Sequence, residues 1–482
     1  MNQNRIARSA RMLAIGRAPG LIAAFAIPLV LARVFEPAEF GTYKQLFLIY
    51  ATLFGIAQLG MAESLYYFVP RDKAQAGRFA ANAICALSLI GLVVVALLFV
   101  NRHLLADWMT NGALASYALM LGVFSALMLV SAVFEIILIA RQRSGGAAWV
   151  YALTDIGRAA FLTVPAMLAL GLRGVMAGAV TFAIIRVIAT VVALVREFGA
   201  DLRVDRVTLR TQLAYALPFA LAVGIEVLYL NWHQYAVASR FDPAAFAIYA
   251  VGCLQVPVVD LIVMSTCNVM MVEMARTQER DSDAARWLWH DSIGRLAFMI
   301  FPLAAFLIVM GHEIIVVLFT STYQASVPIF RLWSLTMLAS VLLADGVLRV
   351  FAQTRYLLFQ NVLQLAIVAS LAGVFLNAFG LQGAVLVTLA ATVIVKTLAV
   401  ARISRLMHLP LREALPWRRL ATATACAAVA AIPVLAVSKV LMLSPMPALI
   451  AAAATYALAY GALYMAVNRH TPAPPLLRAT AS

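Results

Sequence analysis

The sequence predicts an all-α polytopic membrane protein with about 14 transmembrane helices. Its 482 residues are 64% hydrophobic and only 12% charged, whereas charged residues make up about 25% of an ordinary soluble domain. A soluble protein of this length could not cover so much apolar surface. The apolar residues also gather in stretches long enough to span a bilayer, and basic residues concentrate in alternate connections between them. The composition therefore excludes a disordered chain, a coiled coil and a disulfide scaffold.

The predicted spans follow one another along the whole chain. About 20 consecutive apolar residues are needed to cross the hydrocarbon core as a helix. The fourteen segments that meet this length lie at about 12–34, 45–69, 79–100, 114–140, 147–170, 174–194, 212–237, 246–270, 294–318, 326–348, 356–378, 381–401, 420–442 and 446–467.

The distribution of basic residues predicts the orientation of these spans. One set of alternate connections holds 25 of the 36 Lys and Arg residues, and the other set holds five. Because cytoplasmic loops accumulate positive charge, both termini are expected in the cytoplasm of a multi-pass inner-membrane protein. This placement also accounts for the net charge of +15 without a nucleic-acid partner. The first apolar run has no convincing cleavage site, so it is expected to remain as the first span.

An internal repeat predicts two six-helix lobes in the same orientation, related by a pseudo-twofold axis along the membrane normal. Phe35–Tyr43 (FEPAEFGTY) follows the first span, and Phe241–Tyr249 (FDPAAFAIY) follows the seventh at an offset of 206. Glu135 likewise corresponds to Asp345 at an offset of 210. The expected parts are residues 1–195 for the N-terminal lobe, 196–405 for the C-terminal lobe, and 406–482 for appended spans 13 and 14 with a cytoplasmic tail.

The sequence lacks the motifs of catalytic or metal chemistry. Its four cysteines lie far apart without CxxC spacing, and its six histidines have no metal-ligand spacing. Neither a GxSxG motif nor a Walker lysine motif occurs, and the predicted outer loops are short. We therefore expect no catalytic residue, cofactor or metal. A membrane glycosyltransferase or O-antigen ligase, which would carry a large outer loop, is disfavoured.

Ionisable residues inside the predicted spans are the candidates for function. Each costs on the order of 2.5–3.5 kcal/mol on insertion scales unless it faces water or an opposite charge. Two pairs have a partner nearby on their own helix, Asp155 with Arg158 and Asp345 with Arg349. The whole set comprises Glu63, Glu135, Asp155, Glu226, Asp260 and Asp345, with Arg17, Arg33, Arg158, Arg186, Arg331 and Lys396.

Two of these spans carry polar stripes. Glu226, Tyr229 and His233 share one helix face, and Tyr151 shares another with Asp155 and Arg158. Such stripes fit either the lining of a wet cavity or hydrogen bonding between helices. Arginines would suit an anionic cargo and lone carboxylates a cation, so the sign of the cargo stays open. The candidates for cargo binding are Arg17, Tyr151, Arg158, Arg186, Tyr229, His233 and Lys396. The candidates for ion coupling are Asp155, Glu226 and Asp260.

Four short segments resemble those of a known family. They are Arg33–Tyr43 (RVFEPAEFGTY), Ser64–Asp72 (SLYYFVPRD), Glu313–Tyr323 (EIIVVLFTSTY) and Val347–Arg355 (VLRVFAQTR). By their order along the chain, the sequence resembles the oligosaccharide/polysaccharide flippase family of the multidrug/oligosaccharidyl-lipid/polysaccharide exporter (MOP) superfamily, which includes lipopolysaccharide and exopolysaccharide biosynthesis proteins. The resemblance implies two six-helix lobes in a V that open alternately to either side, plus two C-terminal helices.

The resemblance also implies a cargo. It would be undecaprenyl-pyrophosphate-linked oligosaccharide, turned over across the bacterial inner membrane for cell-surface polysaccharide biosynthesis. Cationic residues would hold the pyrophosphate while the lipid tail stays in the bilayer, and a polysaccharide polymerase with its chain-length machinery is a possible partner. A cation-coupled multidrug exporter of the same fold remains the alternative, because a fold does not determine the cargo.

Overall fold

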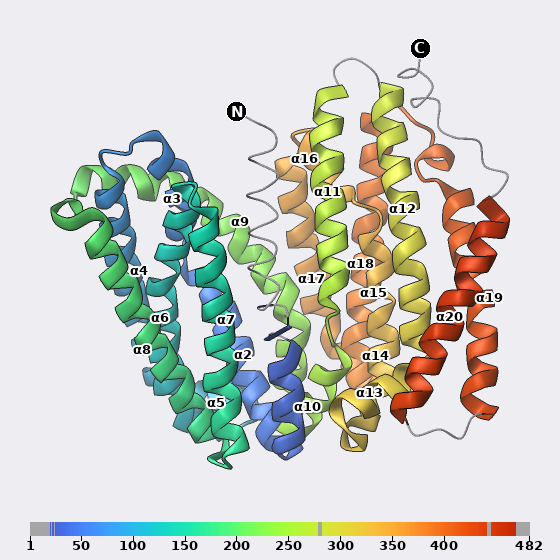
Figure 1. The fold of residues 1–482 in the computed structure, drawn as a ribbon, viewed down its shortest axis with the longest axis horizontal. Coiled ribbons are helices and arrows are strands. Elements are labelled where there is room, and N and C mark those ends of the chain that lie inside the picture. Colours follow the sequence, from blue (N-terminus) through green and yellow to red (C-terminus); the bar gives the residue numbers. More distant parts are fainter. Residues whose placement is uncertain (1–19, 21, 24, 278–281, 441–444, 469–482) are drawn as a thin grey trace. The chain divides into compact units, whose positions relative to one another are not determined.

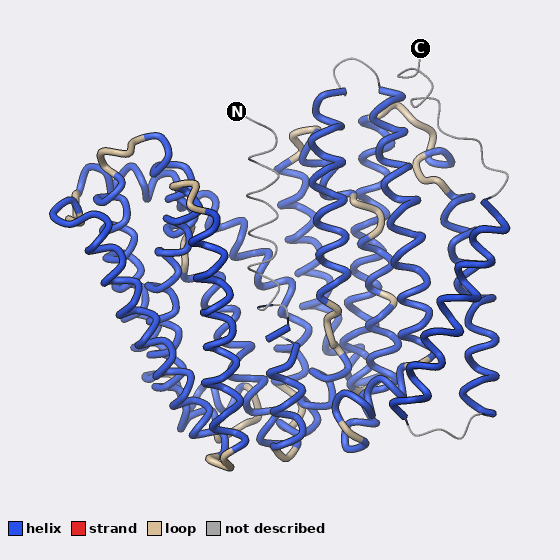
Figure 2. Tube along the Cα trace, in the orientation of Figure 1, coloured by secondary structure: helices blue, strands red, loops and turns tan. Residues whose placement is uncertain are grey.

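A computed structural model describes residues 20–468 except 21, 24, 278–281 and 441–444. In this part of the chain the secondary structure is helical, with short connections and no strand (Figure 2). The chain forms two compact units, Met1–Ala250 with Asn361–Ala384, and Val251–Gln360 with Val385–Ser482. Each unit is described by itself.

The first unit consists mainly of long helices joined by short turns (Figure 1). The apolar helix Phe25–Val34 belongs to it. Its further helices are α2 (Pro37–Ala57), α3 (Met61–Arg71), α4 (Ala76–Val100), α5 (Arg102–Trp108), α6 (Leu114–Ala140), α7 (Ser144–Met167), α8 (Gly171–Phe198), η1 (Gly199–Asp201), α9 (Arg206–Ala238) and α10 (Pro243–Gly252).

Helix α6 is central in the packing of the first unit. It contacts α2, α3, α4, α7 and α8, and the side chains that it buries are largely apolar. Ser125 and Ser131 are buried on the same helix, but each hydroxyl donates to a carbonyl oxygen of its own helix. Their polar groups are therefore satisfied locally, as burial away from water requires.

Buried amide side chains attach the start of α9 to its neighbours. The Nδ2 of Asn82, on α4, donates to Thr208 Oγ1 at 2.8 Å and to the Asp205 carbonyl at 3.2 Å. The Nε2 of Gln212 donates to Ser64 Oγ at 2.8 Å. Helix α9 thus packs against α2, α3 and α4 in this unit. The division into lobes at residue 195 stays a prediction.

The second unit contains more broken helices than the first. Its elements are α11 (Pro257–Thr277), α12 (Ser282–Val309), α13 (Gly311–Phe319), η2 (Ser321–Ser326), α14 (Val327–Ser334), α15 (Thr336–Ser340), α16 (Ala344–Val350), η3 (Leu411–Glu413), α19 (Trp417–Val440) and α20 (Pro445–Asn468). Helices α17 (Thr354–Phe379) and α18 (Leu381–Leu406) contribute residues to both units.

The predicted membrane architecture is confirmed. Among the described residues, ten helices are long and apolar enough to cross a membrane, or twelve if each of two bent pairs is one span. The bent pairs are α2 with α3, and α9 on either side of Pro218. Of the other predicted spans, 147–170 coincides with α7, and 12–34 is described from residue 25 as the helix Phe25–Val34. Each of the fourteen predicted segments thus contains helix.

Not every predicted span is a single helix. The segment 246–270 is interrupted at residues 253–256, between α10 and α11. Pro257 begins α11, and the residue before a proline is disfavoured in the helical region. The break also lies close to the boundary between the two compact units at residue 250.

Candidate functional site

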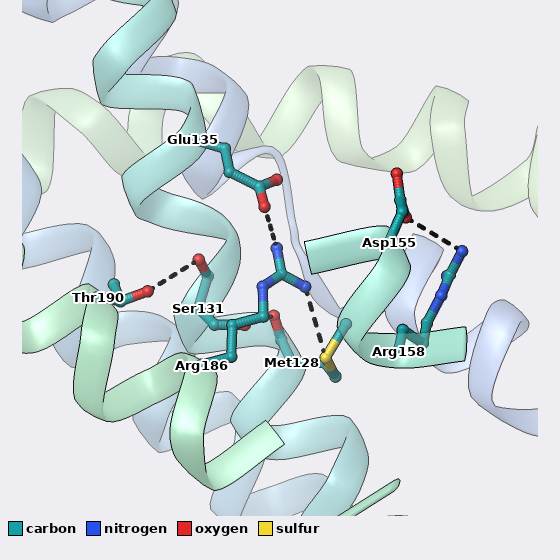
Figure 3. A network of polar contacts seen from close by, with 7 residues as sticks. All are labelled: Met128, Ser131, Glu135, Asp155, Arg158, Arg186 and Thr190. Carbon is teal, nitrogen blue, oxygen red and sulfur yellow. Dashed lines mark hydrogen bonds and ion pairs between the residues drawn. The ribbon is translucent and has the colours of Figure 1, made fainter. Parts of the chain in front are cut away.

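A buried ion pair joins α6 to α8 in the first unit. Arg186 Nη2 lies 2.6 Å from Glu135 Oε1, and the two side chains are only 13% and 11% exposed. The other terminal nitrogen of the guanidinium, Nη1, faces the sulfur of Met128 at 3.5 Å, which is a weak acceptor. Figure 3 shows Arg186 held between the carboxylate and this sulfur. Arg186 therefore has one strong and one weak partner.

A second pair lies on α7. Arg158 Nη2 contacts Asp155 Oδ1 at 3.2 Å, one helical turn away, as the sequence predicted (Figure 3). The Nε of Arg158 is buried and has no hydrogen-bond partner among the described residues. The backbone of Gly20 approaches the Asp155 carboxylate so closely that a Cβ there would overlap it. This arrangement leaves a buried guanidinium donor unsatisfied, which is costly in a membrane interior.

Tyrosines of α2 lie near both pairs. Tyr50 is within electrostatic range of Arg158, Arg186 and Glu135, and Tyr43 is within range of Arg158. We refer to the four charged residues and these two phenol groups together as the first-unit cluster, because their electrostatic fields overlap. It comes from α2, α6, α7 and α8.

The first-unit cluster combines two permanent cations with two carboxylates, so its formal charges balance. Guanidinium stays protonated even at low dielectric and binds phosphate or carboxylate oxygens through paired N–H groups. A buried ion pair with spare donors can exchange its carboxylate for another oxyanion of similar geometry. The cluster thus has the chemistry of an anion site that is internally neutralised.

The second unit has an ion pair of its own. Lys396 Nζ, on α18, lies 2.8 Å from both carboxylate oxygens of Asp345, on α16. The Lys396 side chain is 21% exposed and that of Asp345 is 53% exposed. The predicted pairing of Asp345 with Arg349 was wrong, because the carboxylate is directed to α18 and no ion pair with Arg349 forms among the described residues.

The other sequence candidates come from several elements. Tyr151 is on α7, and Glu226 and Tyr229 are on α9, all partly buried. His233 is buried, and its Nδ1 forms a hydrogen bond with the Tyr249 hydroxyl at 2.6 Å. The last two candidates are Asp260, exposed in the first turn of α11 in the second unit, and Arg17, which lies outside the described residues.

No metal centre is found among the described residues, since no group of three or more His, Cys, Asp or Glu side chains could hold an ion there. The roles of the candidate residues in cargo binding and ion coupling stay predictions.

An apolar groove of about 270 Å³ lies in the second unit. The hydroxyls of Tyr456 and Tyr460 donate to the carbonyls of Ala427 and Phe298, at 3.1 and 3.0 Å. Both phenols therefore present their rings, and not their polar ends, to the groove. It is lined by Pro302, Leu303, Phe306, Ala453, Tyr456, Ala457 and Tyr460.

Sequence reasoning missed the partners of the isolated cations. Arg186 and Lys396 have no acid one turn away, yet each meets a carboxylate from another helix, 51 residues earlier in the chain. The offset of 210 between Glu135 and Asp345 could have revealed this, because Arg186 and Lys396 share it. The tyrosines of α2 gave no comparable pattern.

Comparison with known proteins identifies a family. The polysaccharide biosynthesis protein family matches residues 30–328. No curated protein matches the chain.

Solved structures share the fold. A structure of the lipid II flippase MurJ in an inward closed conformation has a TM-score of 0.70 at 13% identity, covering 93% of this chain and 98% of that chain. An inward-facing multidrug resistance MATE transporter of the MOP superfamily has a TM-score of 0.58 at 16% identity. The match covers 82% of this chain and 94% of that chain. A MOP superfamily transporter from Pyrococcus furiosus has a TM-score of 0.53 at 16% identity, and it is described with a binding pocket of reverse polarity. The match covers 83% of this chain and 95% of that chain. At these identities the likeness concerns the fold.

Proposed function

The chain belongs to the polysaccharide biosynthesis protein family and has the fold of MOP superfamily transporters, and from this premise we propose that it is a flippase. Its cargo would be a polyprenyl-pyrophosphate-linked oligosaccharide, carried from the inner to the outer leaflet of the bacterial inner membrane by alternating access. Both termini would lie in the cytoplasm, and a polysaccharide polymerase would use the product. Surface polysaccharide biosynthesis would depend on this step.

The unsatisfied donor of Arg158 carries this proposal. Its Nε is buried without a partner, and one terminal nitrogen alone contacts Asp155. A pyrophosphate group offers several oxygens, so it can accept from both Nε and a terminal nitrogen in the paired geometry that guanidinium favours. Arg186 lies in the same first-unit cluster with a second incompletely used guanidinium. A dianionic headgroup would match the two cations better than a neutral or cationic cargo.

The apolar groove supports a lipid-linked cargo. Its walls come from α12 and α20 and are formed by aliphatic groups and aromatic rings. A polyprenyl chain could lie there, because it gains only dispersion contacts and needs no polar partner. In this proposal the groove is an apolar surface of the second unit, considered by itself, on which a lipid tail can rest.

Reconstitution in liposomes tests the proposal. The purified chain should move a fluorescent undecaprenyl-pyrophosphate oligosaccharide between leaflets, and Arg158→Gln should reduce the rate at least tenfold. Arg158→Lys should recover only part of it, since ammonium cannot bind two oxygens in parallel. The matched control is Arg173→Gln, which removes an exposed arginine from the first turn of α8.

Two results would overturn the proposal. Wild-type protein that leaves the labelled lipid in its original leaflet would exclude this cargo. The same conclusion would follow if cells that lack the protein displayed normal surface polysaccharide and accumulated no lipid-linked sugar on the cytoplasmic leaflet.

A cation-coupled exporter is the second candidate, and Glu63 favours it. The Oε2 of this residue, in the first turn of α3, is buried and has no hydrogen-bond partner in the part of the chain that the structure describes. A lone buried carboxylate oxygen is suited to H⁺, Na⁺ or a cationic substrate. Uptake of a lipophilic cation by liposomes that carry the protein, abolished in Glu63→Gln, would favour this candidate over the flippase.

A further inference from the structure

The second half of the chain repeats helix boundaries of the first half at an offset of 210 residues. Helix α7 begins at Ser144 and α17 at Thr354. The residues with positive φ just before them, Gln142 and Ala352, keep the same offset. Helices α8 and α18 also begin 210 residues apart. The turn between the fourth and fifth predicted spans is therefore the counterpart of the turn between the tenth and eleventh.

The two interhelical ion pairs occupy equivalent positions in this repeat. Glu135 corresponds to Asp345 and Arg186 to Lys396, both at an offset of 210, and the partners of each pair are 51 residues apart. Both residue types differ between the halves, yet the charge signs are the same. The acid comes from the helix before the turn in each half, and the cation comes from the second helix after it. Asp155 and Arg158 have no charged counterpart, since Leu365 and Val368 stand there.

A carboxylate next to a cation inside a membrane has two possible effects. It lowers the cost of burying the cation while no other anion is present. It also occupies donors that an incoming anion needs, so the anion must displace it. In Arg186 the strong partner is Glu135, and the remaining terminal nitrogen has only the Met128 sulfur.

We propose that Glu135 and Asp345 are built-in competitors of phosphate-bearing cargo for Arg186 and Lys396. Each acts within its own compact unit. The inference rests on the proposed function, and it adds the residues that limit affinity and so permit release. A carrier that binds a dianionic headgroup too tightly would not release it. The carboxylate of the same pair replaces the headgroup on the cation, so the emptied carrier needs no external anion.

The burial of the two pairs predicts different strengths of competition. Glu135 is 11% exposed, whereas Asp345 is 53% exposed. Water screens an exposed charge and weakens its hold on the partner. Removal of the Glu135 charge should therefore increase anion affinity more than removal of the Asp345 charge.

Isothermal titration calorimetry tests the proposal. Inorganic pyrophosphate is titrated into the detergent-purified full-length chain, and its affinity is measured. Glu135→Gln keeps a hydrogen-bond acceptor and removes the charge, so pyrophosphate affinity should increase about tenfold. Asp345→Asn should increase it about threefold. Glu197→Gln is the matched control, because this acid of α8 pairs with the surface residues Arg141 and Arg143 and should leave affinity unchanged.

Two further variants make the test specific. Arg186→Met added to Glu135→Gln should remove the tenfold gain, since the freed guanidinium is its source. Glu135→Asp keeps the charge but shortens the side chain, so affinity should rise by a smaller factor. This second variant serves if the Gln variant does not fold.

The outcomes separate this inference from the flippase proposal. Wild-type and Glu135→Gln proteins that bind pyrophosphate equally would overturn the competitor role and leave the flippase proposal standing. A gain that persists without Arg186, or weaker binding in Glu135→Gln, would assign the pair to helix packing alone. A tenfold gain in a protein that moves no lipid-linked sugar would instead overturn the cargo and retain the competitor role.

Discussion

The backbone of Gly41 lies directly against the main-chain carbonyl of Pro243, where a Cβ on Gly41 would overlap the oxygen. These residues belong to the two copies of the repeated motif, so the copies meet inside the first unit. Pro37 begins α2 in one copy and Pro243 begins α10 in the other. Proline is favoured at the first position of a helix, because its fixed φ suits the helix and its missing N–H costs nothing there. The motif thus specifies both a helix start and a close helix contact.

Substitution of Gly41 by alanine should destabilise the protein by about 3 kcal/mol, at the upper end for overpacking, because the obstructing atoms belong to the backbone. Gly224 on α9 is the matched control, since nothing lies within 4 Å of a Cβ built there. Gly224→Ala should stabilise by up to about 1 kcal/mol through helix propensity. Thermal unfolding in detergent measures both. Equal melting temperatures for the two variants would contradict the close contact.

The cap of α9 should make stability depend on pH. The backbone amide of Thr208 donates to Asp205 Oδ2 at 3.0 Å, and this bond holds the pKa of Asp205 below its ordinary value of 3.8. The folded state therefore favours the ionised carboxylate. The contribution of this carboxylate to stability is present above pH 3.8 and is lost as the pH falls through the lowered pKa. Asp205→Ala should lower the melting temperature at pH 7, and the difference from wild type should shrink toward pH 3.

Asp205→Asn is the control for this pH dependence. Asparagine caps helices about as well as aspartate, and it does not titrate. The Asn variant should therefore keep most of the stability at pH 7, and its difference from the Ala variant should be constant with pH. If the melting temperatures of wild type and Asp205→Ala differed by the same amount at pH 7 and at pH 3, protonation of the Asp205 carboxylate would not be coupled to folding.

Hydropathy and charge were sufficient to predict the membrane fold. The predicted segments coincide with helices because a bilayer requires long apolar stretches whose backbone groups are satisfied internally. Breaks within a segment were harder to predict. The counterpart of the continuous α6 is divided into α14, α15 and α16, with Leu343 at positive φ just before α16. An apolar leucine carries no turn signal, so only packing could reveal this break.

The contacts of the site were less predictable than its residues. Asp155 and Arg158 pair on one helix, and spacing alone predicted this. Arg186 required knowledge that α6 packs beside α8, which hydropathy does not give. His233 shares a face with Glu226 in the sequence, but its hydrogen bond to Tyr249 depends on the neighbouring α10. Sequence periodicity gives the face of a helix, whereas the partner depends on tertiary packing.

Removal of one partner from the buried pair of the first unit should be costly. Glu135→Leu leaves Arg186 with an uncompensated buried charge, and we expect a loss of about 3–5 kcal/mol. The double variant Glu135→Leu/Arg186→Met removes both charges and should be more stable than Glu135→Leu alone. Unfolding measurements on both single variants and the double variant give the coupling energy. Additive losses in the double variant would show that the two charges do not stabilise one another.

The equivalent pair of the second unit should cost much less to break. Asp345 is 53% exposed, so its interaction with Lys396 is expected to contribute about 1 kcal/mol or less. Asp345→Leu should therefore lower the melting temperature by only a fraction of the change in Glu135→Leu, although the two acids occupy equivalent positions in the repeat. Lys396→Arg should be tolerated, because both carboxylate oxygens already accept from the lysine and guanidinium can bind them in parallel. Equal losses in Asp345→Leu and Glu135→Leu would mean that Asp345 is as buried in the folded protein as Glu135. In that case the two acids would also compete equally for anions, and pyrophosphate affinity should rise by the same factor in Asp345→Asn and Glu135→Gln.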